Sequence, residues 1–141
     1  MSEVPKGPGY RVGITFNLKQ KRENELEDEQ AEYDSIHTIE AIGKAIGKTG
    51  CEAIFLEAGE DLPQKLKESR PDIVFNVAEG KGGRGREAQV PAILNLYSIP
   101  FTGSDETTLC IALDKGLAKK IVKSCRIKTP VFFVWNGTMS K

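Results

Sequence analysis

The sequence has no excess of charge of either sign, since 20 Lys and Arg residues stand against 20 Asp and Glu residues among 141 residues. Proteins that bind nucleic acids or anionic membranes draw much of their affinity from clustered cations. The balance therefore argues against nucleic acid and membrane partners. Histidine is almost absent as well, because His37 is the only one. This excludes metal sites built from several histidines, and we interpret His37 as a structural residue at or near the surface.

Cysteines and long apolar runs are scarce. The three cysteines, Cys51, Cys110 and Cys125, are far apart and form no CxxC pair. This is typical of a reduced intracellular chain rather than of a disulfide framework or a zinc site. Residues 1–9 carry no apolar signal-peptide core, and no apolar run approaches the length of a membrane-spanning helix. These absences predict a cytoplasmic protein.

Short apolar runs alternate with longer amphipathic segments, which is typical of a parallel sheet covered by helices. The predicted fold class is α/β: a doubly wound, mostly parallel four-stranded sheet with helices on both faces, similar to a Rossmann fold. The last strand is expected at a sheet edge, because Pro100 has no N–H to donate. We expect strands at 11–16, 52–56, 72–77 and 99–102, and helices at about 35–49 (capped by Asp34 or Ser35), 63–69, 90–97, 104–113 (capped by Ser104) and 114–124.

The chain divides into three parts in this prediction. Residues 1–10 form a flexible N-terminus, 11–125 form the α/β domain, and 126–141 begin a second domain. The last boundary rests on the apolar run Val131–Trp135, which is typical of a strand but follows the end of the βα series. The polar segment 17–32 is predicted to be a solvated loop, or alternatively a lid that orders over a ligand.

Two glycine-containing segments suggest a nucleotide or anion site at first sight. Gly43–Thr49 has three residues between its first two glycines, where a phosphate-binding loop needs four. It also lies at the C-terminal end of a predicted helix, whose dipole repels phosphate, so we reject it. Gly80–Arg86 instead connects a central strand to a helix N-terminus, where parallel sheets bind anions and small ligands. It is either a ligand-facing loop or a tight turn that needs glycine for positive φ.

Three parts of the sequence, taken together, resemble a known family. They are 31–35, which leads into the first helix; 72–80 with 84–92, which flank the glycine loop; and 99–104, which leads to Leu113-Asp114-Lys115. In this order and spacing they resemble the N-terminal, pre-ATP-grasp domain of D-alanine–D-alanine ligases and ligase-like proteins of the ATP-grasp superfamily. The resemblance runs from Arg11 to about Trp135, and 99–115 is its most specific part.

The resemblance implies a reaction. Such ligases, which act in peptidoglycan biosynthesis, use ATP and Mg²⁺ to phosphorylate the carboxylate of one amino acid. The amine of a second amino acid then attacks the acyl phosphate and gives a dipeptide. Neutralising the charge on the transferred phosphoryl group requires cations. The resemblance also implies a small amino acid as the ligand and allows a homodimer, as is common among the relatives.

The resemblance also implies roles for particular residues. Glu32 matches the acidic residue that holds the ammonium group of the first amino acid, and Lys115 matches the lysine that reaches an ATP phosphate. No catalytic residue and no metal ligand is assigned within the chain. The loop that lines the substrate pocket is matched by Glu79, Gly80, Gly82 and Gly83.

Two departures from the family pattern bear on function. Ligases proper usually carry a histidine where this sequence has Glu79, which changes recognition of the first substrate's carboxylate and leaves the identity of the first amino acid open. The ATP lid, the Mg²⁺-binding carboxylates and the arginine of the ligation centre belong to later domains, so we expect the 141-residue chain alone not to ligate. The alternative is an amino-acid-binding or interaction module without catalysis. Glu32 and Lys115 then remain ordinary solvated residues.

Overall fold

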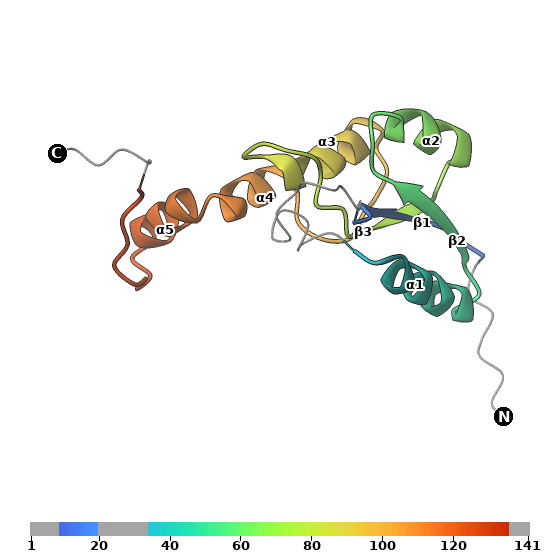
Figure 1. Ribbon diagram of the computed structural model, residues 1–141, viewed down its shortest axis with the longest axis horizontal. Coiled ribbons are helices and arrows are strands. Elements are labelled where there is room, and N and C mark those ends of the chain that lie inside the picture. The colour runs from blue at the N-terminus through green and yellow to red at the C-terminus, as the bar shows by residue number, and fades with distance from the viewer. Residues whose placement is uncertain (1–8, 20–33, 136–141) are drawn as a thin grey trace, which may run out of the picture.

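The computed structural model describes residues 9–19 and 34–135 and contains one parallel sheet. Its strands are β1 (Arg11–Phe16), β2 (Glu52–Glu57) and β3 (Ile73–Asn76), in the order β2-β1-β3 (Figure 1). β1 is the central strand and pairs in parallel with both neighbours. All three strands were expected from their apolar runs, with ends that differ by no more than one residue.

Helix α1 (Ile36–Lys48) covers one face of this sheet. It begins where the hydroxyl of Ser35 accepts a hydrogen bond from the amide of Thr38 at 3.2 Å, which satisfies one of the amides left free at a helix start. Ile39 is fully buried against Ile14 and Phe16 of β1. The 3.6-residue spacing of isoleucines in α1 therefore serves to close this half of the core.

The opposite face is covered by α2 (Leu62–Ser69) and α3 (Gln89–Leu96), the latter preceded by the short 3₁₀ helix η2 (Arg86–Ala88). Leu62 and Leu66 of α2 and Leu94 of α3 are at most 2% exposed. They pack with residues of β2, β3 and the loop after it in a second buried cluster, which also contains Leu56, Val74, Ala78 and Val90. Apolar side chains of the sheet are thus buried under helices on both of its faces.

The sheet has three strands rather than the expected four. Residues 99–102 do lie beside β3, but they form a single parallel bridge, between Val74 and Phe101. The amide of Val74 donates to the carbonyl of Pro100 at 2.8 Å, and the amide of Thr102 donates to the carbonyl of Val74 at 2.9 Å. Pro100 contributes no N–H, which limits how far this ladder can extend. The predicted place of this segment at the edge of the sheet is therefore right, and its predicted extent as a strand is wrong.

Two further helices, α4 (Glu106–Leu113) and α5 (Lys115–Ser124), lead away from the sheet (Figure 1). α4 is capped by Asp105, whose carboxylate accepts from the amide of Thr108 at 2.7 Å, and not by Ser104 as expected. Both residue types cap well, so the pattern left the choice of neighbour open. α5 buries none of its residues. No helix among the described residues is long and apolar enough to cross a membrane.

The apolar run Val131–Trp135 was expected to be a strand and is not one in the described part of the chain. It lies back along α5, where Lys119 Nζ is 5.3 Å from the ring centre of Phe132. A strand forms only with a partner for its backbone, and no described strand lies beside this run. We call α5 together with residues 125–135 the arm.

Candidate functional site

A cavity of about 340 Å³ lies where the chain leaves the carboxyl ends of the strands. This is the end of a parallel sheet at which ligands usually bind, and the volume is within the usual range for small-molecule sites. The wall is made by the segment after β3, the start of α1, η2, the turn before α4 and α4 itself. Its lining residues are Asp34, Asn76, Val77, Ala78, Glu79, Glu87, Gly103, Ser104 and Leu109.

Two asparagines at strand ends fix the backbone around the cavity. Asn76 Oδ1 accepts from the hydroxyl of Thr15 at 2.7 Å and from the amide of Ala78 at 3.2 Å. Asn17, directly after β1, donates through Nδ2 to the carbonyl of Ala58 at 2.9 Å and accepts at Oδ1 from the amide of Gly80 at 2.9 Å. These bonds tie the ends of all three strands to the loop that follows β3.

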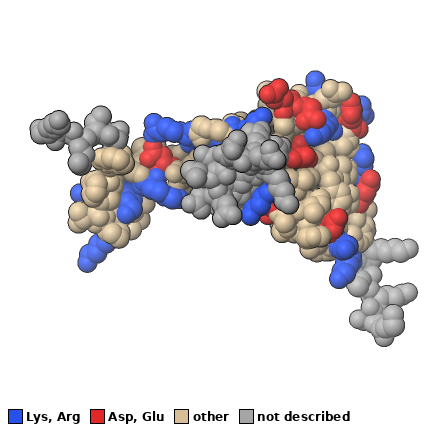
Figure 2. All heavy atoms as spheres, viewed as in Figure 1, with Lys and Arg blue, Asp and Glu red and all other residues tan. Residues whose placement is uncertain are grey.

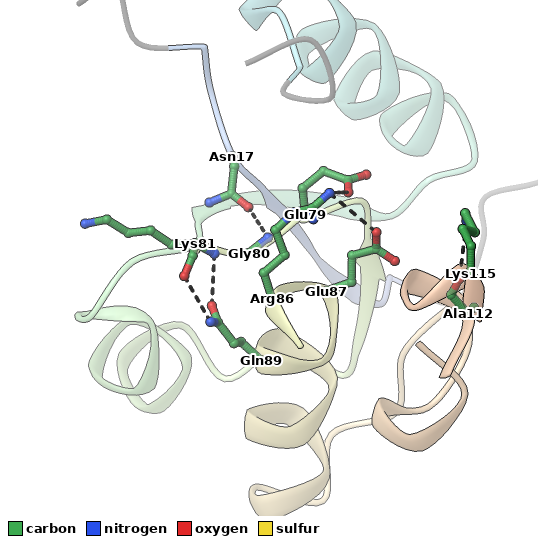
Figure 3. Close-up of polar contacts among 9 residues, drawn as sticks. All are labelled: Asn17, Glu79, Gly80, Lys81, Arg86, Glu87, Gln89, Ala112 and Lys115. Carbon is green, nitrogen blue, oxygen red and sulfur yellow. Dashed lines mark hydrogen bonds and ion pairs between the residues drawn. The ribbon is translucent and has the colours of Figure 1, made fainter. Parts of the chain in front are cut away.

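The glycine loop 80–85 is itself anchored at its start. Gln89 Oε1 accepts from the amide of Lys81 at 3.0 Å, while its Nε2 donates to the carbonyl of the same residue at 3.1 Å (Figure 3). Gly80 is buried at φ +72°, a backbone conformation that favours glycine. The amides of Gly80 and Lys81 are therefore used within the protein, so this first part of the loop is a structural turn.

Charge in the cavity comes from carboxylates. Asp34, Glu79 and Glu87 all line it, and no lysine or arginine is among its lining residues in the ranges 9–19 and 34–135. One guanidinium lies beside two of these groups: Arg86 Nη2 is 3.9 Å from Glu79 Oε2 and 3.7 Å from Glu87 Oε1 (Figure 3). Glu79, Arg86 and Glu87 are all about a quarter exposed, at 32%, 21% and 23% of their side chains. The cavity therefore favours a ligand that brings a positive group.

The residues singled out in the sequence fall in different places. Glu79 lines the cavity, and Gly80 lies buried at the start of the loop behind it. Gly82 and Gly83 are exposed at positive φ and are not among the lining residues. Glu32 lies outside the described residues, so the prediction that it faces the glycine loop stays a prediction.

Lys115 stands apart from the cavity, at the first position of α5. It is exposed, and its Nζ donates to the carbonyl of Ala112 at 3.2 Å (Figure 3). The positive end of the α5 dipole lies at this point, which suits an anion such as a phosphate. Within the described ranges 9–19 and 34–135, no group of three or more His, Cys, Asp or Glu residues is placed to hold a metal ion. Lys115 thus fits a phosphate contact.

Asp114 connects the glycine loop to α5. Its Oδ1 caps the helix by accepting from the amide of Leu117 at 3.0 Å, and its Oδ2 is the ion-pair partner of Arg84 at the tip of the loop. The Leu117 N–H, followed by the Arg84 side chain, holds the pKa of Asp114 below its usual value. The helix that carries Lys115 is thereby joined to the loop that follows the cavity.

We expect the start of α5 to loosen in acid because of this carboxylate. A depressed folded-state pKa means that the stabilisation is complete above the ordinary Asp pKa of about 3.9 and is lost as the pH falls through the lower folded value. An NMR titration should show the Leu117 amide shift following Asp114, and Asp114→Asn should remove that titration. Asp105, which caps α4 in the same way with a lowered pKa, provides the control. A Leu117 amide shift that does not change when Asp114 is protonated would contradict the cap.

Two residues of the cavity were missed in the sequence. Asp34 was weighed only as a helix cap, a role that Ser35 takes. Glu87 was not considered, although it lies in the first turn after the glycine loop. Its position, directly after a β-strand and glycine loop and before a helix, is the signal that could have identified it.

No family model matches the chain. Curated relatives do: the D-alanine–D-alanine ligase of Aquifex aeolicus is 38% identical over 96 residues, which is 68% of this chain and 32% of that protein. The ligase of the same name from Moorella thermoacetica is 30% identical over 103 residues, 73% of this chain and 33% of that protein. The chain therefore spans about a third of the length of these relatives.

A solved structure shares the fold. It is a D-alanine–D-alanine ligase from Bacillus anthracis complexed with ATP, with a TM-score of 0.67 and 21% sequence identity. The match covers 94% of this chain and 42% of that chain. Since fewer than a tenth of the residues here fall outside the match, most of the arm lies within the shared fold.

Proposed function

We propose, from the premise that the chain is a relative of the N-terminal part of D-alanine–D-alanine ligases, that it is the amino-acid-binding portion of an ATP-dependent carboxylate–amine ligase. The amino acid occupies the acidic cavity at the carboxyl ends of the strands. The product of such a ligase is a dipeptide. In this proposal the 141-residue chain alone binds this first substrate without ligating it, since it spans about a third of the length of the ligases that it matches.

The observation that carries the proposal is the charge of the cavity. Among the residues that the structure describes, three carboxylates line it, from Asp34, Glu79 and Glu87, and no cation does. An amino acid is a zwitterion, and only its ammonium group is attracted by such a wall. The ammonium therefore enters the cavity, and the carboxylate points toward the opening, where it can be modified.

The chain's own residues bind and orient in this scheme. Glu79 and Glu87 hold the ammonium group, and Arg86 beside them limits their mutual repulsion. The anchored turn at Gly80 keeps Glu79 in place. ATP supplies the phosphoryl group, and phosphorylation of the carboxylate at the opening gives it a good leaving group. Lys115 is the residue of this chain that would contact a phosphate.

Calorimetry with three small probes tests which end of the amino acid is recognised. D-Alanine carries both charges, ethylamine only the ammonium and propionate only the carboxylate. We expect D-alanine and ethylamine to bind the chain and to compete with each other, and propionate to show no heat of binding. Binding of propionate without ethylamine would contradict the proposed orientation, and the absence of binding by all three would contradict the site.

A further inference from the structure

The three carboxylates of the cavity come from elements on opposite faces of the sheet. Asp34 leads into α1, which packs on one face. Glu87 belongs to η2, which lies with α3 on the other face (Figure 1). Glu79 lies on the Glu87 side, because Arg86 of η2 is paired with both residues. The cavity therefore has an acidic position toward each face of the sheet rather than a single acidic cluster.

These two acidic positions differ in their partners. Arg86 Nη2 is 3.9 Å from Glu79 and 3.7 Å from Glu87, so a guanidinium offsets part of the negative charge there. Asp34 forms no ion pair with any cation in the ranges 9–19 and 34–135. Figure 2 shows that the cations of α5 and of the residues after it gather over the arm, away from the sheet. Asp34 is therefore the place in the cavity for a cation that a ligand brings.

The surface between the two acidic positions is apolar. Val77 and Ala78, which follow β3, line the cavity at the end of the sheet, and Leu109 of α4 lines it as well. Val77 packs against the buried cluster on the α1 face, whereas Ala78 belongs to the cluster on the face of α2 and α3. Methylene groups are buried favourably along such a surface. The cavity thus combines an acidic position on each side with an apolar stretch between them.

We propose, resting on the function proposed above, that the first substrate is a diamino acid, whose aliphatic side chain ends in a second ammonium group. Its α-ammonium contacts Glu79 and Glu87, and its terminal ammonium pairs with Asp34. Its methylene groups lie along Val77 and Ala78. Three carboxylates and one guanidinium leave room for two further positive charges. D-Alanine brings only one ammonium group, whereas a diamino acid brings two and leaves its carboxylate at the opening.

Calorimetry with D-ornithine and D-norleucine tests the second acidic position, because their side chains are equally long and differ by an ammonium group in place of a methyl group. We expect D-ornithine to bind the chain about tenfold more tightly or better. Asp34→Asn should abolish this preference and leave D-alanine binding within about twofold of its original value. The start of α1 is kept in this variant, since Ser35 caps it. Asp61→Asn, at an exposed position before α2 and away from the cavity, should keep the preference.

D-Alanine is the reference ligand, because its binding tests the amino-acid site alone. If D-alanine binds but D-ornithine binds no more tightly than D-norleucine, the first substrate is not a diamino acid, while the cavity remains the amino-acid site. If neither D-alanine nor D-ornithine binds, the cavity is not an amino-acid site and both proposals are wrong. A preference for D-ornithine that survives Asp34→Asn, or is lost in Asp61→Asn, overturns the pairing of the second ammonium with Asp34.

Discussion

Replacing Gly80 with alanine is expected to lower the free energy of unfolding by about 2–4 kcal/mol. Gly80 has φ +72°, which an alanine adopts only with strain. In addition, a Cβ at this position would overlap the carbonyl group of Arg86. Because that carbonyl belongs to the backbone of η2, the turn and the helix cannot both keep their places. Urea unfolding followed by circular dichroism measures the loss.

Gly83 separates the two causes. It has φ +83°, but a Cβ there meets no atom within 4 Å. Gly83→Ala should therefore cost only the backbone strain, about 1 kcal/mol. The larger loss at Gly80 should also displace Glu79 and weaken amino-acid binding, whereas Gly83→Ala should leave it unchanged. Equal losses of stability in the two variants would show that the tight contact with Arg86 is absent.

The double variant Glu79→Gln, Glu87→Gln is expected to weaken binding of D-alanine or ethylamine by about a hundredfold. Hydrogen bonds to charged groups contribute roughly 1.5–3 kcal/mol each, and both carboxylates line the cavity. Glutamine keeps the shape and one acceptor oxygen, removes the charge and puts an NH₂ donor in place of the second oxygen. Calorimetry with the single variants and the double variant measures the change, and each single variant should lose about tenfold.

The sign of this effect decides the orientation of the ligand. If the carboxylate of the amino acid entered the cavity, removing two negative charges would strengthen binding, contrary to our account. Glu60→Gln provides the control, since Glu60 is exposed in the turn before α2, away from the cavity. It should bind like the unchanged chain.

Strands and their order along the chain were predictable because burial on both faces makes them short and apolar. The sequences of β1 and β3 are such runs. Ser35, which caps α1, was one of the two residues expected to do so. The extents of the segments 99–102 and 131–135 were not predictable. Propensity describes what a segment can form, whereas a ladder also needs a partner strand, which sequence pattern does not reveal.

The cavity was predictable only in part. The glycine loop marked its position, since a loop between a parallel strand and a helix lies at the ligand-binding end of the sheet. Glu79 followed from the same segment. Asp34 and Glu87 come from separate elements, and only the packing of α1 and η2 brings their side chains to one cavity. Likewise, the Gly80 amide donates a hydrogen bond to Asn17, 63 positions away, and the sequence around either residue does not predict this bond.

The balanced net charge conceals how charge is distributed along the chain. It argues against nucleic acid and membrane partners, which stays a prediction, but residues 115–135 hold six cations and no acid. Net charge describes long-range attraction to the whole molecule, whereas contacts depend on local patches. The even balance is compatible with an acidic ligand cavity at one place and a basic arm at another.

The most direct test of the acidic cavity as the amino-acid site is an NMR titration of the isotope-labelled chain with D-alanine. The account predicts that amide shifts change at the cavity wall, at Ala78, Glu79, Glu87 and Ser104, while those of the arm stay in place. The same amides should respond to ethylamine and not to propionate. Shifts confined to the arm, or a cavity wall that does not respond to saturating D-alanine, would contradict the account.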